Sequence, residues 1–561
     1  MYITGYVPFG DKGLLIRVET DIRRGIPGID ISGLAEGAVK EARERVRAAF
    51  RNSGLSFPLD RILINLAPAG IKKEGAALDL PMALSVMAAA GLVPGLGALP
   101  EQLMVLGELE LSGRVRPVRG VLAAVAAGLA ERIRFFIVPK ENEAEAAILL
   151  HPRIDRDLGD PEAPAGYSPD SHGHIHFTAV SSLDEAAHGL VLLTQTGGFP
   201  PCFHRPPAPE LPLDCGDFAD VRGQDRYKRA LEIAAAGGHN LLVFGAPGAG
   251  KTMLARRFPS IMAELTAEEA VEVTRIHSLA GQPQSPCTLI TRPPFRAPHH
   301  SASVEGLLGG GRTVRPGEIS LAHLGTLFLD EAPEFRIDAL QALREPLEEG
   351  VLTIVRADGP VKLPANFQLI MAANPCPCGR LGSSRWEPDP EGNAPSTGDC
   401  FCSPEEVYRY WRKFGGALLD RIEIRVPVSG STQELYDNTG EPESSADIRR
   451  RVIRAVEIQR RRFAESGSGN GTYGIPGMIR RNARMSPTQI GRFCPCTETA
   501  NQAYRKAAER LGLSGRSCHG ILRTARTIAD LEDKELIEAD HILEAIQHRR
   551  LGEDPFDVLR L

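Results

Sequence analysis

The sequence predicts an α/β protein with a parallel-sheet core, preceded by a separate α+β domain. Three observations support this prediction. A short apolar strand enters a glycine-rich turn and a helix at Asn240–Thr252, which reads NLLVFGAPGAGKT. A second apolar strand, Gly325–Glu331, ends in two carboxylates, and such strand and helix alternation is typical of parallel sheets. Six prolines within Gly197–Pro212 separate this core from the first 196 residues, because Pro-rich chain is stiff and resists burial.

Length, composition and charge limit the class of protein. The chain has 561 residues, of which 42% are hydrophobic and 24% charged, so disorder, collagen and coiled coil are excluded as its dominant state. The N-terminus has no basic segment leading into an apolar run, and prolines and glycines interrupt Leu80–Pro100, the longest uncharged window. We therefore expect a cytoplasmic protein without a membrane span. Arg449–Arg526 holds 17 basic and four acidic side chains, which predicts a polyanion contact near the C-terminus.

Residues 1–196 alternate strand-like and helix-like patterns, which predicts a mixed α+β domain. Glu36–Ser53 is the clearest helix, because its apolar residues recur on one stripe. The other expected elements are strands at Leu14–Val18, Ile62–Leu66 and Phe135–Pro139, helices at Pro81–Ala90 and Val121–Glu131, and a hairpin of Met104–Leu111 with Arg114–Val118.

The glycine-rich turn has the spacing of a phosphate-binding loop, Gly245-x-x-x-x-Gly250-Lys251-Thr252. Its glycines allow the backbone to curl until successive N–H groups point at phosphate oxygens, and the helix that follows adds its positive dipole end. In this pattern the lysine bridges the β- and γ-phosphates and the threonine ligates Mg²⁺. We therefore predict a site for ATP and Mg²⁺ formed by Gly245, Ala246, Pro247, Gly248, Ala249, Gly250, Lys251 and Thr252.

Two further core strands end in polar side chains. Asp330 ends the strand GTLFLD and is expected to hold Mg²⁺ through water. Glu331 follows and is expected to orient and deprotonate the attacking water. Gln368–Asn374 is another strand, whose last residue, Asn374, hydrogen-bonds the γ-phosphate or the water, or simply starts a turn.

Between these strands, Glu349–Phe367 predicts a hairpin of Val351–Val355 with Pro360–Leu363. Arg356 and Lys362 flank its turn. These two cations either follow the phosphate backbone of a nucleic acid or are solvated charges on an exposed hairpin.

Four cysteines frame the polar segment 376–402. Cys376-x-Cys378 and Cys400-x-Cys402 are separated by 21 residues, and two close thiolate pairs predict a closed, structural Zn²⁺ site. Unliganded surface thiols remain the alternative, because C-x-C is less specific than C-x₂-C. Cys494-Pro-Cys496 has no visible partner pair, so we expect no metal there.

The order of these motifs resembles the AAA+ ATPases, and more narrowly the YifB/ComM-type subfamily of their magnesium-chelatase-like branch. The resemblance rests on six sequence segments that occur in the same order as in the family: Asp217–His239, Phe295–Ser303, Pro316–Leu324, Leu343–Glu349, Leu418–Ile422 and Leu513–Leu531. The resemblance covers nearly the whole chain. It implies a Lon-protease-like (ribosomal S5 domain 2-like) α+β domain at 1–196, a Pro-rich linker at 197–214, an AAA+ core at 215–430, a linker and basic helix at 431–476, and a helical lid at 477–561.

The resemblance also implies roles for arginines. Arg421 matches the arginine finger that reaches the γ-phosphate of a neighbouring subunit, unless it forms a salt bridge with Asp420 or Glu423. Arg516 matches the lid arginine called sensor 2, with Arg523 as the second choice. The hairpin described above matches the one that lines the central pore of the family's rings.

The Lon-like domain is expected to lack protease activity. Proteases of that fold carry a serine after a Lys-Asp/Glu-Gly turn and a lysine after the next hairpin. This chain has Ala76 and Ala77 after the turn, and Arg119–Leu122 offers no lysine. Without a nucleophile and its base there is no covalent route to peptide hydrolysis.

The resemblance implies a homo-oligomeric ring, expected as a hexamer, that hydrolyses ATP and moves branched or single-stranded DNA. A branch-migration helicase in recombination or natural transformation is the leading hypothesis. The alternatives are a chelatase-like remodeller of a protein or metal-insertion partner, and a nucleotide-gated ring that binds without doing work. An ATP-dependent protease is disfavoured by the two alanines.

Overall fold

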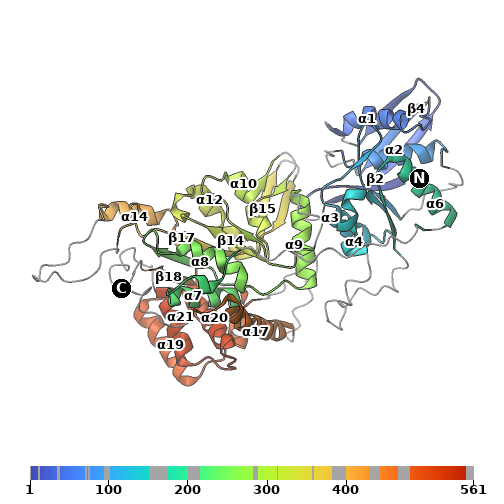
Figure 1. Ribbon diagram of the computed structural model, residues 1–561. Coiled ribbons are helices and arrows are strands. Elements are labelled where there is room, and N and C mark those ends of the chain that lie inside the picture. Colours follow the sequence, from blue (N-terminus) through green and yellow to red (C-terminus); the bar gives the residue numbers. More distant parts are fainter. Residues whose placement is uncertain are drawn as a thin grey trace, which may run out of the picture.

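The computed structural model describes residues 2–550, except 11–12, 34–37, 70–72, 74–75, 94–101, 151–174, 197, 200–214, 282–288, 312–313, 357–358, 382–399, 429–441 and 465–480. Figure 1 shows an N-terminal part in blue to teal, a core in green to yellow, and C-terminal helices in red that pack on one face of the core. In the described part of the chain, no helix is both long enough and apolar enough to cross a lipid bilayer.

The N-terminal part is built on a seven-stranded mixed sheet. In sheet order its strands are β3 (Gly28–Ser32), β4 (Arg61–Ala67), β2 (Leu14–Arg23), β1 (Tyr2–Val7), β5 (Leu103–Val105), β8 (Phe135–Pro139) and β9 (His176–Val180). The accompanying helices are α1 (Ala38–Asn52), α2 (Asp79–Ala89), α3 (Val121–Ala130), α4 (Glu143–Leu150) and α6 (Leu183–Thr196). Helices α1 and α2 pack over a core of aliphatic side chains from alternate strand positions.

The predicted hairpin of this part is shorter than expected. Leu103–Val105 joins the main sheet between β1 and β8, and only β6 (Glu108–Leu109) pairs with β7 (Val115–Arg116). Gly107 lies between the two segments. A side chain is not tolerated at this position, because a Cβ would lie 2.9 Å from the Val115 side chain. The glycine therefore lets the chain leave the sheet and start the hairpin.

The core is a five-stranded parallel sheet. Its order is β11 (Phe295–Arg296), β14 (Thr326–Leu329), β17 (Gln368–Ala373), β10 (Leu241–Gly245) and β18 (Ile424–Val428). Its central strands are continuous apolar runs because both faces are covered, as parallel sheets require. Alternate residues therefore serve two separate cores: Leu241 and Val243 face one, Leu242 and Phe244 the other.

Different helices cover the two faces of the core sheet. The face with Leu241 packs on α7 (Asp225–Gly237) and on the C-terminal helices α17 (Ser445–Ala464), α18 (Pro487–Phe493), α19 (Glu498–Leu511), α20 (Gly515–Leu531) and α21 (Ala539–Arg550). The opposite face packs on α12 (Ile337–Ala342), α13 (Arg344–Glu349), the hairpin β15 (Val351–Arg356)–β16 (Gly359–Pro364), α14 (Pro404–Arg412) and α15 (Gly416–Leu419).

Helix α9 (Ala267–Ala280) connects the core to the N-terminal part, and Figure 1 shows it beside α3. Its Leu279 is buried among side chains of the N-terminal part, including Tyr6 and Val121. The neighbouring Ser278 hydroxyl donates a hydrogen bond to the Glu145 carboxylate of α4. The last turn of α9 is thus embedded in the N-terminal part.

Candidate active site

The phosphate-binding loop lies at the carboxyl end of β10, and α8 (Lys251–Arg257) begins directly after it. Gly245 must be glycine, because a Cβ there would lie 2.1 Å from the Val428 carbonyl oxygen on the neighbouring strand. Gly248 and Gly250 both have φ +79°, the left-handed region that favours glycine. Each glycine of the motif therefore answers a steric or conformational requirement.

Gly245→Ala is expected to destabilise the core by about 1–3 kcal/mol, because the clash is with a backbone atom that cannot rotate away. Gly416→Ala is the matched control: a Cβ on Gly416 meets nothing within 4 Å. Thermal unfolding of the two variants checks this prediction. Equal melting temperatures for both variants would contradict it.

Lys251 joins the loop to the end of β17. Its ammonium donates hydrogen bonds to the carbonyl oxygens of Gly245 (2.6 Å) and Ala246 (2.9 Å) and to Asn374 Oδ1 (3.2 Å). Burial lowers the pKa of Lys251, and the carboxylate of Asp330, followed by that of Glu331, opposes this shift. The predicted lysine and the predicted asparagine are therefore in direct contact.

Thr252, Asp330 and Glu331 form the adjacent part of the site. The Thr252 hydroxyl donates to Asp330 Oδ2 at 2.9 Å, and the Glu331 N–H donates to Asp330 Oδ1 at 3.0 Å. This hydroxyl and carboxylate are the oxygen ligands that Mg²⁺ prefers, so the residues present fit a magnesium–triphosphate substrate. Lys251 would supply positive charge for the phosphates of such a substrate.

Glu331 is an exposed residue held in a left-handed conformation at φ +50°. Non-glycine residues in this region cost about 1–3 kcal/mol, and they cluster at functional sites. Its carboxylate lies 3.6 Å from His300 Nδ1, and the rings of His299 and His300 are 4.1 Å apart. Sequence reasoning missed this partner, because nothing in the spacing relates His300 to a residue 31 positions later.

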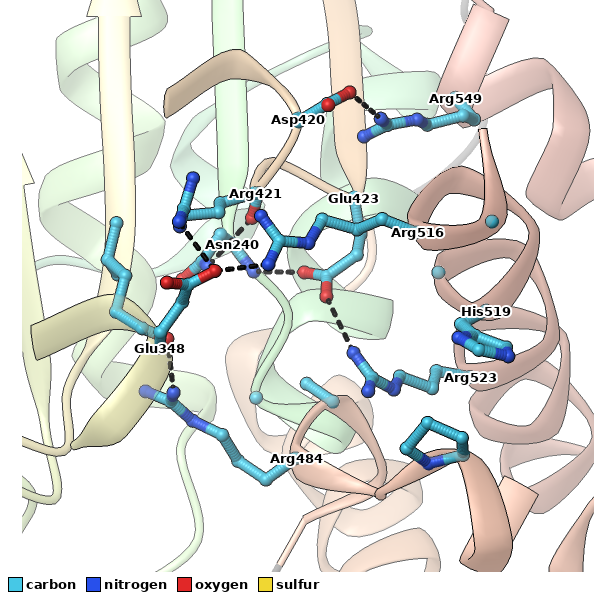
Figure 2. A pocket seen from close by; sticks show the side chains of 16 residues that line it. Asn240, Glu348, Asp420, Arg421, Glu423, Arg484, Arg516, His519, Arg523 and Arg549 are labelled. Carbon is cyan, nitrogen blue, oxygen red and sulfur yellow. Dashed lines mark hydrogen bonds and ion pairs between the residues drawn. The ribbon is translucent and has the colours of Figure 1, made fainter. Parts of the chain in front are cut away.

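A second constellation surrounds a pocket of about 440 Å³ between the core and the C-terminal helices (Figure 2). Glu348, at the end of α13, pairs with both Arg421 Nη2 (2.5 Å) and Arg516. Arg421, followed by Arg516, lowers the pKa of the Glu348 carboxyl. The same pocket is lined by Arg484, Arg523 and Arg549.

The partners proposed as the alternative for Arg421 pair with other arginines. Asp420 binds Arg549 at 3.1 Å, and Glu423 faces Arg523 at 3.9 Å. Glu348 is the carboxylate that Arg421 contacts, and sequence reasoning did not identify it. The first and second choices for the lid arginine, Arg516 and Arg523, line the same pocket.

The two constellations lie at opposite ends of the strands of the core sheet. The backbone of Arg421 is bound at the amino end of β10, where Asn240 Nδ2 donates to its carbonyl oxygen at 2.9 Å. Lys251 is bound at the carboxyl end of the same strand. Five residues of extended strand span roughly 16 Å. Arg421 and Arg516 are therefore not brought to Lys251 of their own chain.

The hairpin that carries the predicted DNA contacts forms as β15 and β16, with Thr353 opposite Lys362. Lys362 is exposed. The side chain of Arg356 lies outside the described residues. The free cation that the structure describes at this turn is thus a lysine on β16, beside the exposed Val355.

In the described part of the basic C-terminal stretch, at least nine of its 17 basic side chains have partners within the protein. Arg462 and Arg526, for example, share Asp530. The arginines of this stretch with carboxylate or carbonyl partners are Arg449, Arg450, Arg451, Arg460, Arg462, Arg484, Arg516, Arg523 and Arg526. About half of its positive charge is therefore paired, whereas Arg454, Arg461, Arg492, Arg505, Lys506 and Arg510 are exposed.

The two alanines that are expected at the nucleophile position of a Lon-type protease lie at the start of α2. Ala76 and Ala77 precede α2, and the turn residues Lys72, Glu74 and Gly75 lie outside the described residues. Lys73 is fully buried, and its ammonium donates to the carbonyl oxygens of Gly33 (2.7 Å) and Pro68.

A parallel sheet with this loop and a helical C-terminal region defines a P-loop ATPase fold of the AAA+ class. Residues 217–436 match the family described as magnesium chelatase, subunit ChlI. Residues 18–142 match the subunit ChlI domain of Mg-chelatase, and residues 442–549 match the ChlI C-terminal domain. The chain belongs to this magnesium-chelatase-like family and, within it, to the YifB/ComM proteins.

Two relatives span nearly the whole chain. The uncharacterised protein YifB of Salmonella typhimurium is 38% identical over 542 residues, which cover 96% of this chain and 94% of the relative. Competence protein ComM of Haemophilus influenzae is 35% identical over 553 residues, 97% of this chain and 96% of the relative. A Lon protease of Salinispora arenicola is 33% identical over 153 residues, 25% of this chain and 19% of the protease. The fold therefore includes a Lon-protease-like α+β domain.

Proposed function

We propose that the protein is a ring-forming ATPase in which adjoining protomers share each active site, and that it moves DNA. The observation that carries the proposal is the separation of the two constellations. Lys251 and Asp330 lie at the carboxyl ends of the core strands, while Arg421 and Arg516 converge on Glu348 at the opposite ends of the strands. An arginine that stabilises the transition state must reach a phosphate, so it serves a neighbour's site.

We propose the following roles for these residues. Lys251 binds the β- and γ-phosphates, and Thr252 and Asp330 hold Mg²⁺, which neutralises charge on the phosphates. Glu331 accepts a proton from the attacking water, and Asn374 orients the γ-phosphate. From the neighbouring protomer, Arg421 and Arg516 leave Glu348 and bind the phosphoryl oxygens. Hydrolysis then depends on assembly, which is expected as a hexamer.

DNA is the proposed polymer substrate for two reasons. A relative that spans nearly the whole chain is named a competence protein, and competence denotes the uptake of DNA by a cell. The β15–β16 hairpin also carries an exposed Lys362 that can contact a phosphate backbone. A branch-migration helicase acting in recombination or natural transformation fits both reasons.

The test measures ATPase rate and binding with single-stranded, duplex and four-way-junction DNA across a salt series. DNA is expected to stimulate hydrolysis, and affinity is expected to fall steeply with salt, because bound phosphates release counterions. Lys362→Ala is expected to weaken binding and to reduce the salt slope, by about 1 for each hairpin in contact. Lys534→Ala, an exposed lysine before α21, is the control and is expected to bind as the unmodified protein does.

A remodeller of a protein partner, or a nucleotide-gated ring, is the second candidate. The internal pairing of the C-terminal arginines favours it, because a broad basic surface for DNA is then smaller than the sequence suggests. Indifference of the ATPase to every DNA tested would contradict the DNA proposal and support this candidate.

A further inference from the structure

The four cysteines at the carboxyl end of β17 are arranged around one point. Cys376 Sγ lies 3.3 Å from Cys378 Sγ and 3.7 Å from Cys400 Sγ, and the latter two are 3.6 Å apart. With Cys402, all four sulfurs lie within 4.8 Å of one another. Four sulfurs at about 2.3 Å from a tetrahedral zinc ion would be about 3.8 Å apart. The cluster therefore has the size of a four-thiolate zinc site.

The backbone around Cys376 supports a thiolate. The side chain of Cys376 is fully buried, and the Leu381 N–H donates to its Sγ at 3.4 Å. The Gly379 N–H donates to the Cys376 carbonyl oxygen at 2.9 Å, which closes a tight turn. Such N–H donors around ligand sulfurs orient metal ligands in proteins. A cluster of surface thiols without a ligand requires neither the turn nor the donor.

The same turn touches the phosphate-binding loop. Gly379 has φ +77°, and a Cβ at this position would lie 2.7 Å from Pro247 Cγ. The turn also begins two residues after Asn374, which contacts Lys251. Any displacement of the cysteine turn therefore acts on both walls of the nucleotide site.

The second cysteine pair anchors the other end of the segment. Cys402 is followed by Ser403, whose side chain caps α14 in a capping box with Glu406. From α14, the Trp411 indole N–H donates to the Pro375 carbonyl oxygen at 3.0 Å, and its ring meets Phe244 of β10 edge-on at 5.5 Å. The cluster thus links α14, β17 and the loop after β10.

We propose that Cys376, Cys378, Cys400 and Cys402 bind one structural zinc ion, and that this ion holds the turn at Gly379 against Pro247 so that the nucleotide site keeps its shape. All four coordination positions come from the protein, so the ion binds no water or substrate. Coordination replaces thiol protons with the metal and involves no change of oxidation state. The second half of the proposal rests on the ATPase function proposed above.

The metal is tested by zinc analysis of the full-length protein, purified from zinc-supplemented culture. About one zinc per chain is expected, and the double variant Cys400→Ser/Cys402→Ser is expected to lose it. The matched control is Cys494→Ser/Cys496→Ser, a pair with the same spacing that belongs to no described cluster of metal-ligating residues. A zinc-free unmodified protein, or loss of zinc from the control, would overturn the metal site.

The coupling is tested by equilibrium binding of a fluorescent ATP analogue, without DNA and without turnover. Gly379→Ala keeps all four ligands and is expected to retain zinc while ATP affinity falls by roughly tenfold to a hundredfold, because the turn must move away from Pro247. The zinc-free cysteine variant is expected to show a similar loss. Unchanged affinity in Gly379→Ala would overturn the coupling even if the cysteine variant failed to fold. Neither readout depends on DNA, so failure of the DNA proposal stays distinguishable.

Discussion

Arg421→Ala is expected to reduce ATP turnover by roughly 10³-fold or more, as for arginine fingers in other phosphoryl-transfer enzymes. ATP binding is expected to persist, because the Lys251 cradle is at the other end of strand β10. Lys251→Ala is expected to be inactive because it loses the lysine that binds the phosphates, although its Arg421 is intact. Steady-state ATPase rates and nucleotide binding measure both.

Mixing these two inactive variants tests whether the site is shared. In a mixed ring, about one interface in four combines the intact cradle of Arg421→Ala with the intact arginine of Lys251→Ala, so activity is expected to return. Mixing Arg421→Ala with the double variant Lys251→Ala/Arg421→Ala gives no such interface and is the control. If the first mixture stays as inactive as its components, Arg421 does not act on a neighbour.

Glu331→Gln is expected to slow hydrolysis by roughly 10²–10⁴-fold, because glutamine keeps the shape of the side chain but cannot accept the proton of the attacking water. ATP is expected to remain bound, since Lys251, Thr252 and Asp330 are unchanged. Single-turnover hydrolysis of radiolabelled ATP, together with its retention on the protein during gel filtration, gives both quantities.

Glu334→Gln provides the matched control for that substitution. Glu334 is also exposed, three residues further along the same turn, and hydrogen-bonds through its backbone to Glu331. It is expected to hydrolyse ATP at the unmodified rate. Undiminished turnover in the Glu331 variant would remove this residue from the mechanism and leave the base to be found elsewhere, with His300, whose Nδ1 lies 3.6 Å from the Glu331 carboxylate, as a candidate.

The loop and the strands that carry the candidate nucleotide site could be predicted from the sequence, because their requirements are local. The glycine spacing around Lys251 follows from the curl of one loop, and the apolar strand before Asp330 follows from burial on both faces. Strand β18 was not predicted, since Arg425 and Pro427 interrupt its apolar run. The strand tolerates a proline because it lies at the edge of the sheet.

What could not be predicted depends on contacts between distant segments. Glu348 pairs with Arg421 and Arg516, which lie 73 and 168 positions further along the chain, and no spacing rule connects them. The proximity of Gly379 to Pro247 likewise arises only once β10 and β17 are neighbours. The cysteine spacing predicted a metal, whereas its position against the nucleotide loop required the fold.

The two ion pairs of Glu348, with Arg421 and Arg516, have a consequence for an unassembled subunit. One carboxylate pairs with both guanidinium groups, so we expect a lone protomer to keep them withdrawn, and a neighbour's phosphates must outcompete that carboxylate before they are released. If protomers share their active sites as proposed, dilute protein is expected to hydrolyse ATP slowly, and its specific activity is expected to rise once its concentration permits assembly. Specific ATPase activity that stays constant as the protein is diluted would argue against this dependence on assembly.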